Sequence, residues 1–331
     1  MIVAVVLSAF ASFLAVGLFL AVARRTRLLD RPGHRSSHTR PTPTGAGLAL
    51  ILALGATALA VGFEPAIPRL GAEAFAAEFR FLLGGALALS LLGLWDDARG
   101  VPALWRLLAQ LLCAMGLVLT LPVPQPGLMA LFVLALTWTM NAFNFMDGSD
   151  GMAGFQTVIS GVFLAFLFHL SGDSGLMLAS LAVAASALGF LPWNWPPARC
   201  FMGDAGSVPL GWLIGGLCLV GLVRDSVSWP AAILVLAVFH VDAGLTLLRR
   251  VGSGERWYTA HRTHVYQKLL AQGWTHGKVL LTYAILNVVI VAPALVFSGL
   301  APRWGWAGPA AALMALVITW CVASLKLGER P

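Results

Sequence analysis

The sequence predicts an all-α integral membrane protein in which about eleven helices cross the bilayer. Of its 331 residues, 59% are hydrophobic and only 11% are charged, whereas soluble domains carry about 25% charged residues. The apolar residues are gathered into runs long enough to span a membrane, and short polar segments separate these runs. A soluble fold could not cover its surface with so few polar groups, so an ordinary soluble enzyme, a disordered chain and a small secreted scaffold are all excluded.

The predicted spans follow one another along the whole chain. They cover residues 2–23, 46–63, 80–95, 103–121, 127–143, 152–170, 174–191, 207–223, 229–248, 279–299 and 306–325. The third and fifth are short, because a span needs about 20 apolar residues. The sequence contains no internal repeat, low-complexity segment or separate soluble domain, so we expect one transmembrane domain over residues 1–331. Basic residues follow the first apolar run instead of preceding it, which favours a retained helix over a cleaved signal peptide.

The basic residues predict the orientation, because Lys and Arg in short loops are retained on the cytoplasmic side of a membrane. The predicted topology places Arg69, Arg80, Arg224 and Arg303 on one side and the other 17 of the 21 basic residues on the opposite side. We therefore expect an external N-terminus and a cytoplasmic C-terminus. The basic excess is then explained by membrane topology, and no nucleic-acid partner is expected.

Five aspartates fall at predicted cytoplasmic helix ends or in short cytoplasmic loops, namely Asp96, Asp97, Asp147, Asp150 and Asp204. Carboxylates at a membrane edge are costly unless they are paired, solvated or bound to a cation, so they are functional candidates. Adjacent carboxylates such as Asp96 and Asp97 raise each other's proton affinity unless a cation compensates. The pair therefore suits Mg²⁺ binding, activation of a phosphate nucleophile, or both, and a solvated helix end is the structural alternative.

A second polar segment reads Asn141-Ala-Phe-Asn144-Phe-Met-Asp147-Gly-Ser-Asp150-Gly151. Its polar positions recur every three residues, so a continuous helix would present them as one slowly rotating stripe. Lipid does not tolerate such a stripe, which must therefore line a polar cleft. A turn could explain one Asp-Gly pair, but not all four polar positions.

A third segment runs from Asn194 to Ser207 and precedes an apolar span. Asp204 lies just before that predicted helix, where its carboxylate could cap the helix or bind a metal ion beside a phosphate. Phe201 could stack on a planar base and Asn194 could recognise the edge of that base, although Phe201 by itself is compatible with ordinary packing.

The basic loop before the tenth predicted span contains His261-Arg262-Thr263-His264. Histidine and arginine at this density suit recognition of a diphosphate by charge and hydrogen bonds. For Arg249 and Arg250 we expect only the ordinary role of loop cations on the cytoplasmic side.

These motifs, in this order, resemble the polyprenyl-phosphate N-acetylhexosamine-1-phosphate transferases. The family includes phospho-MurNAc-pentapeptide translocase and the transferases that initiate O-antigen and teichoic acid synthesis. The resemblance covers nearly the whole chain. It rests on Asp30-Arg-Pro, the run from His38 to Gly47, Asp96-Asp97, the run from Asn141 to Gly151, Phe201-Met-Gly-Asp-Ala-Gly-Ser207 and the histidine-rich loop.

The resemblance implies a reaction at a cytoplasmic cleft. A UDP-linked N-acetylated amino sugar gives its sugar-1-phosphate to polyprenyl phosphate and UMP leaves. It also implies a Mg²⁺ cofactor, with Mn²⁺ as an alternative, and a multi-pass location in the bacterial inner membrane as part of lipopolysaccharide or other cell-envelope synthesis. The sugar, the pathway and homodimerisation are left open.

The resemblance also implies roles for individual residues. Asp204 corresponds to the metal ligand, and Asp96 and Asp97 to the catalytic acidic pair, with Asp150 as a further catalytic candidate. The expected substrate-binding residues are Asn141, Asn144, Asp147, Asn194, Phe201, His261, Arg262, His264, His38 and Arg40. The first loop lacks the Lys that some relatives place near Thr42, and Arg40 is the candidate substitute. Direct attack by the lipid phosphate and a covalent aspartyl intermediate both remain open.

Two other classes of protein compete with this interpretation. An ion-coupled transporter would place acidic residues near the middle of the membrane and often shows inverted repeats, whereas these acids gather at one face and no repeat is visible. A CDP-alcohol phosphotransferase shares a vaguely similar acidic motif, but Met152 and Ala153 follow Gly151 where that motif requires Ala-Arg.

Overall fold

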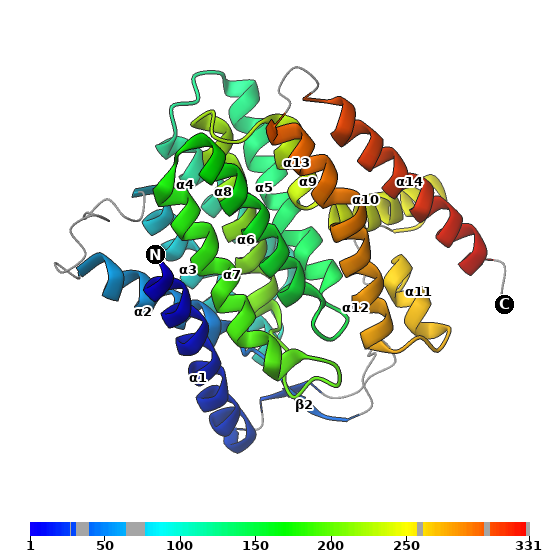
Figure 1. Cartoon of the computed structure of the whole chain (residues 1–331). Coiled ribbons are helices and arrows are strands. Elements are labelled where there is room, and N and C mark those ends of the chain that lie inside the picture. The colour runs from blue at the N-terminus through cyan, green and yellow to red at the C-terminus, as the bar shows by residue number, and fades with distance from the viewer. Residues whose placement is uncertain (27, 31–39, 64–76, 257–260, 301–304, 329–331) are drawn as a thin grey trace.

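A computed structural model describes residues 1–26, 28–30, 40–63, 77–256, 261–300 and 305–328, and it is almost entirely helical (Figure 1). The elements are α1 (Ile2–Thr26), β1 (Leu29–Asp30), β2 (Thr42–Pro43), α2 (Gly47–Phe63), α3 (Ala77–Arg99), α4 (Ala103–Thr120), α5 (Pro126–Met146), α6 (Met152–Ser171), α7 (Ser174–Asn194), α8 (Asp204–Val223), α9 (Trp229–Val235), α10 (Ala237–Gly252), α11 (Val265–Ala271), α12 (His276–Ile285), the π-helix η1 (Leu286–Val291), α13 (Ala292–Leu300) and α14 (Ala307–Gly328). β1 and β2 form one short antiparallel pair.

The prediction of a polytopic all-α membrane protein is confirmed. Within the described ranges, nine helices are long and apolar enough to cross a membrane, the bent pair α9–α10 forms a tenth candidate, and α2 is a shorter apolar helix. Each of the eleven predicted segments therefore falls on helical structure, while the number of crossings stays a prediction. The short lengths predicted for the third and fifth segments are wrong, because α3 has 23 residues and α5 has 21. Both helices continue beyond the predicted apolar segments into polar residues.

Two predicted spans are not regular helices. The ninth is bent by 77° between α9 and α10, and the tenth contains the π-helix η1. The break frees the carbonyl of Val235, which accepts hydrogen bonds from Ser160 Oγ at 3.0 Å and Gln156 Nε2 at 3.4 Å. Asn287 of η1 donates to Gln156 Oε1 at 2.9 Å. Because lipid supplies no hydrogen bonds, a broken helix at membrane depth needs such protein partners.

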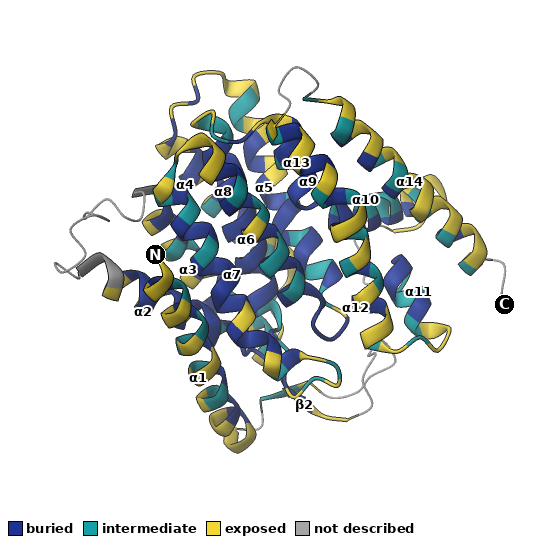
Figure 2. Cartoon of the chain, viewed as in Figure 1, coloured by how far each residue is buried: buried dark blue, intermediate teal, exposed yellow. Residues whose placement is uncertain are grey.

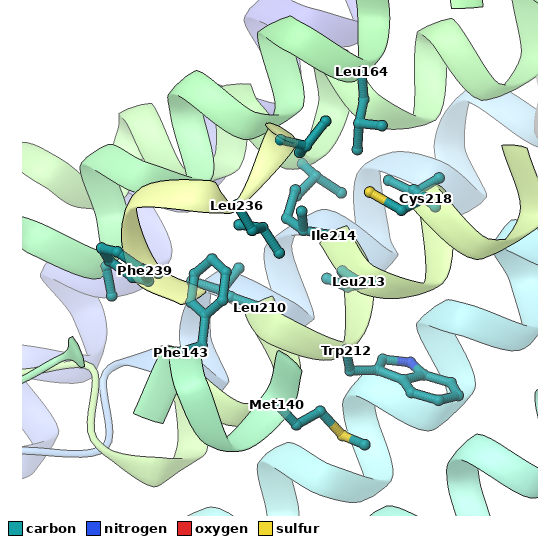
Figure 3. Close-up of a cluster of buried hydrophobic side chains, with 14 of the residues drawn as sticks. Met140, Phe143, Leu164, Leu210, Trp212, Leu213, Ile214, Cys218, Leu236 and Phe239 are labelled. Carbon is teal, nitrogen blue, oxygen red and sulfur yellow. The ribbon is translucent and has the colours of Figure 1, made fainter. Parts of the chain in front are cut away.

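Helix α8 lies at the centre of the molecule and packs against both α3 and α5. Trp212 of α8 is fully buried, and its indole N–H donates to the carbonyl of Leu82 at 2.7 Å. Around it, side chains of α5, α6, α8 and the α9–α10 region interdigitate in one apolar core (Figure 3). In contrast, the outward faces of helices such as α14 are exposed and apolar, as expected for contact with lipid (Figure 2).

Close glycine contacts hold the N-terminal end of α8 against its neighbours. A Cβ atom on Gly47 of α2 would lie 2.1 Å from the Cα of Gly206, and one on Gly93 of α3 would lie 2.4 Å from the carbonyl of Asp204. Small residues at helix interfaces allow backbones in membrane proteins to approach this closely. This approach brings the start of α8 beside the end of α3, where the predicted acidic residues lie.

Candidate active site

The first part of the candidate site is an acidic cluster formed by Asp96, Asp97 and Asp204. Asp97 is in the last turn of α3, and its carboxylate accepts the backbone N–H groups of Asp204 at 3.1 Å and Ala205 at 3.4 Å. It thereby satisfies two N–H groups that would otherwise lack partners at the start of α8. Asp204 is the first residue of α8 and not a cap before it, so the capping alternative is wrong.

Gly203 permits this contact between Asp97 and α8. Its φ angle is +66°, and a Cβ atom there would lie 2.2 Å from Asp97 Oδ2. A larger residue would both strain the backbone and push the carboxylate away from the N–H groups that it accepts. The Gly-Asp-Ala-Gly sequence at this position therefore follows from close packing around Asp97.

Arg106 joins two carboxylates of the cluster. Its Nη1 atom donates to Asp96 Oδ2 at 2.5 Å and to Asp204 Oδ2 at 2.7 Å. Asp96 Oδ1 also accepts the N–H of Val101 at 2.6 Å. Sequence reasoning counted Arg106 only as a topology-determining cation. The missed signal was its position in α4, an otherwise uncharged apolar helix, where an ionisable residue is a functional candidate by default.

The two asparagines of α5 extend the cluster along one face of that helix. Asn144 Nδ2 donates to Asp204 Oδ1 at 2.7 Å and to Ser207 Oγ at 3.1 Å. Asn141, one turn earlier, donates to Gln110 Oε1 of α4 at 2.6 Å. Asn144 thus lies in the cluster, whereas Asn141 joins α5 to α4 beside it.

The predicted continuous stripe from Asn141 to Asp150 is wrong in its second half. Helix α5 ends at Met146, and residues 147–150 form a turn, here called the acidic turn, before α6 begins. Gly151 has a φ angle of +76°, which glycine adopts without strain, so the chain can change direction here. The turn still faces the cluster. Burial, together with the nearby carboxylates of Asp204, Asp97 and Asp150, raises the pKa of Asp147 well above its usual value.

Asp150 holds two other segments in place. Its carboxylate accepts the N–H of Ala198 at 2.9 Å, and its own N–H donates to His276 Nδ1 of α12 at 3.1 Å. It is buried. A catalytic role for Asp150 stays a prediction, and the contacts observed here are structural.

Asn194 is buried, and both ends of its amide contact backbone. Its Oδ1 atom accepts the N–H of Gly151 at 2.8 Å, and its Nδ2 atom donates to the carbonyl of Cys200 at 2.9 Å. These bonds connect the acidic turn to the loop before α8. The contacts observed for Asn194 are structural, and its contact with a nucleobase stays a prediction. Phe201 is partly exposed, and its stacking role stays a prediction.

Residues 261–264, here called the histidine loop, form the second part of the site. The rings of His261 and His264 lie 4.9 Å apart. Burial, together with the nearby His264, Arg250 and Arg249, lowers the pKa of His261 to about 4. Burial also lowers the pKa of His264. Both rings therefore favour the neutral form at pH 7, so positive charge in this loop comes from Arg262.

Two residues that sequence reasoning set aside or missed hold the histidine loop. Arg249, expected to be an ordinary loop cation, donates to the carbonyl of Thr263 at 3.0 Å and lies over the ring of Trp320. Asp242, which was not a candidate, is buried and accepts the N–H of Val265 at 2.9 Å. The signal for Asp242 was a carboxylate in a predicted span.

Of the two candidates in the first loop, Arg40 is exposed and His38 lies outside the described residues.

The donor chemistry of the cluster fits Mg²⁺. Among the described residues, no group of three or more His, Cys, Asp or Glu side chains forms a ready-made metal site. Mg²⁺ does not require such a cage, because it usually binds one or two carboxylates and completes its shell with water and substrate phosphates. Asp204, beside Asp96 and Asp97, offers such oxygens, and a cationic guanidinium already bridges two of them.

The position of the acidic residues differs from that expected for an ion pathway at the middle of the membrane. Asp96 and Asp97 lie at the end of α3, Asp204 begins α8, and the acidic turn follows α5. All of them thus lie at one end of their helices. A coupling site of a transporter would instead lie near the middle of the bundle.

The chain is similar to known proteins over most of its length. The profile of glycosyl transferase family 4 matches residues 79–222, from the first turn of α3 to the last turn of α8. The chain is 30% identical over 315 residues to a probable undecaprenyl-phosphate N-acetylglucosaminyl 1-phosphate transferase of Bacillus subtilis, covering 88% of this chain and 84% of that protein. It is 30% identical to a decaprenyl-phosphate N-acetylglucosaminephosphotransferase of Mycobacterium leprae, covering 87% and 81%. A phospho-N-acetylmuramoyl-pentapeptide-transferase of Synechococcus is 28% identical, covering 91% and 92%.

Proposed function

This chain belongs to glycosyl transferase family 4, and we propose that it transfers an N-acetylated amino-sugar 1-phosphate from a UDP-sugar to polyprenyl phosphate. An oxygen of the lipid phosphate attacks the phosphorus atom that bears the sugar. The bond from this phosphorus to the UMP oxygen breaks, and UMP leaves with the electron pair. The products are UMP and a polyprenyl-diphosphate sugar.

The acidic cluster is the observation that carries this proposal. Phosphoryl transfer requires mainly positioning of the reactants and neutralisation of charge. Bound Mg²⁺ would neutralise phosphate charge, with Asp204 as its ligand and Asp96 and Asp97 beside it. Asp97 is fixed by two backbone N–H groups and Asp96 by Arg106 and Val101, so neither carboxylate needs to reorganise during the reaction.

The two parts of the site suit the two ends of the donor. We assign the acidic turn to the uridine end, because the Asp147 carboxyl has no hydrogen-bond partner among the described residues and its raised pKa favours the protonated form. We assign the histidine loop to the diphosphate and sugar, because Arg262 supplies charge and two neutral imidazoles supply hydrogen bonds. The sugar nucleotide would approach from the cytoplasm, because the distribution of basic residues favours a cytoplasmic location for this end of the bundle.

An apolar groove between α5, α8 and the α9–α10 break would hold the isoprenoid chain of the acceptor. Leu136, Cys218 and Ile233 are among its lining residues, and Ala135 on its wall is exposed. We expect Ala135→Trp to raise KM for a long polyprenyl phosphate more than for geranyl phosphate. Equal effects on both acceptors would remove the groove from the proposal.

The proposed reaction is tested with purified protein in detergent, Mg²⁺ and polyprenyl phosphate. UDP-GlcNAc, UDP-GalNAc, UDP-QuiNAc and UDP-FucNAc form the donor panel, and release of UMP is the readout. We expect turnover with at least one donor and none after EDTA, and we place the product at the start of O-antigen or another envelope polysaccharide. Ion-driven uptake into vesicles, without UMP release from any donor, would favour a transporter instead.

A further inference from the structure

We propose that Asp242 is a positioning residue that holds the histidine loop against the acidic turn. This inference rests on the proposed function, since it concerns how the two parts of that site are kept in register. Asp242 lies on α10 and is only 3% exposed. Its role follows from the donors that surround its carboxylate and from what those donors are attached to.

The carboxylate of Asp242 collects donors from four helices. Thr246 of α10 donates to Oδ1 at 3.2 Å, and the hydroxyl of Tyr283 on α12 donates to Oδ2. The indole N–H of Trp320 on α14 donates to Oδ1 at 3.2 Å. The N–H groups of Val265 and Tyr266 at the start of α11 donate at 2.9 and 3.4 Å. A carboxylate offers about four lone-pair sites, so these donors fill it.

The bonds to α11 determine where the histidine loop ends. His264 directly precedes α11, and the two N–H groups held by Asp242 belong to the next two residues. The ring of His264 lies between the rings of Phe145 and Tyr266, with centroids 6.0 Å from each. Fixing the start of α11 therefore fixes the place of His264 and, 4.9 Å from it, of His261.

Tyr266 carries the same constraint to the acidic turn. Its backbone N–H is held by Asp242, while its hydroxyl donates to the carbonyl of Phe145 at 2.9 Å. A Cβ atom on Gly148 would lie 2.2 Å from that hydroxyl oxygen, so the acidic turn packs directly on Tyr266. Tyr266 thus connects Asp242 to Phe145 and Gly148, which lie on either side of Asp147 in the chain.

The C-terminal helix α14 completes the assembly. Trp320 donates to Asp242, and the guanidinium of Arg249 lies 5.6 Å from the centre of the Trp320 ring. Arg249 also donates to Ser324 of α14 and to the carbonyl of Thr263 in the histidine loop. Because its oxygens are buried and occupied, Asp242 does not touch the substrates, and its effect on them passes through the histidine loop.

The test is steady-state kinetics of Asp242→Asn with the UDP-sugar and polyprenyl phosphate varied separately. Losing hydrogen bonds to a buried charge should displace the loop and raise the donor KM by about 10- to 100-fold. The acceptor KM should stay within about twofold of the wild-type value. A general folding defect would not separate the two substrates. Asp173→Asn is the matched control, because it removes a carboxylate bonded to Arg224 away from the site.

A double-mutant cycle sharpens this test. Arg262→Ala should cost much less donor affinity in the Asp242→Asn background than in the wild type, since the loop is already displaced. Full additivity of the two effects would overturn the proposal, as would an unchanged donor KM in Asp242→Asn.

Two milder variants keep the proposal testable if Asp242→Asn does not fold. Tyr283→Phe and Trp320→Phe each remove one hydrogen bond to Asp242, and each should raise the donor KM by about two- to tenfold. Unchanged donor KM in both would overturn the positioning role while wild-type turnover still supports the proposed function. A wild-type protein inactive with every donor would instead overturn the proposed function, and this inference with it.

Discussion

The acidic cluster and the histidine loop are built in different ways. The cluster lies at the ends of long, regular helices, and its carboxylates are held by backbone N–H groups and by Arg106. The histidine loop lies among short or broken elements, α10 to α12 and η1, and depends on one buried carboxylate, Asp242. Charge is concentrated in the first region, whereas the histidines of the second are neutral. The comparison distinguishes a charged region held at helix ends and suited to chemistry from a region held by one buried carboxylate and suited to donor recognition.

The largest expected effect comes from removing charge from the cluster. Asp204→Asn or Asp97→Asn should lower kcat by about 10³-fold or more, because each removes preorganised charge. At position 97 an amide also has only one acceptor oxygen for the two N–H groups that the carboxylate of Asp97 accepts. UMP release measures this loss, and the thermal midpoint of the purified protein shows whether folding is retained. Turnover near the wild-type rate in both folded variants would remove the cluster from the mechanism.

Arg106 tests whether the cluster needs its bridging cation. Arg106→Gln should lower kcat by about 10²-fold and lower the thermal midpoint, because Asp96 and Asp204 then repel without compensation. Arg106→Lys should have an intermediate effect, since the shorter side chain keeps the positive charge but does not place its nitrogen where Arg106 Nη1 lies. Arg99→Gln, at an exposed position at the end of α3, is the control and should leave both quantities unchanged. Equal kinetics for all three variants would contradict the bridging role.

Gly203 tests the fixed geometry of the cluster. Gly203→Ala and Gly273→Ala both place a Cβ on a residue with positive φ, which costs about 1–3 kcal/mol. Only the first also meets Asp97, whereas nothing lies within 4 Å of the added atom at Gly273. We therefore expect a larger thermal shift in Gly203→Ala than in Gly273→Ala, and a loss of activity of about tenfold or more in Gly203→Ala alone. Comparable activities would show that Asp97 need not be held in place.

The smallest effect concerns pH and the histidine loop. His261 is held neutral in the folded protein down to about pH 4, whereas an unfolded chain takes up the proton near pH 6.5. The unfolded state therefore binds more protons in this window, and stability falls as the pH drops from about 6.5 to 4. His261→Gln should flatten this dependence of the thermal midpoint, while His169→Gln, at an exposed position on α6, should not. An unchanged slope in His261→Gln would contradict the assigned neutrality.

The sequence predicted the helical segments and the grouping of the aspartates well, because both depend on local signals. Hydropathy detects the length of an apolar run, and the Asp-Asp and Asn-Asp motifs lie next to such runs. Hydropathy could not detect the bend after Val235, since the residues around the bend remain apolar. It also shortened α3 and α5, whose last turns are polar but helical.

The partners of the site residues were not predictable in this way. Arg106 and Asp204 are 98 positions apart, and their contact follows from the packing of α3, α4 and α8. The sequence also could not show that the Asn194 amide bonds to the backbone of Gly151 and Cys200, because these contacts depend on the fold. Asp242 lies 23 positions before Val265 in an apolar predicted span, so no local motif connects it to the histidine loop.

Transfer of a β-³²P-labelled UDP-sugar tests the central claim most directly. If the protein transfers sugar 1-phosphate, the label moves into the lipid fraction together with the sugar, and unlabelled UMP appears in equal amount. Asp204→Asn should abolish both signals. Release of labelled UDP, with sugar alone on the lipid, or retention of the label in the intact nucleotide with every donor, would contradict the account.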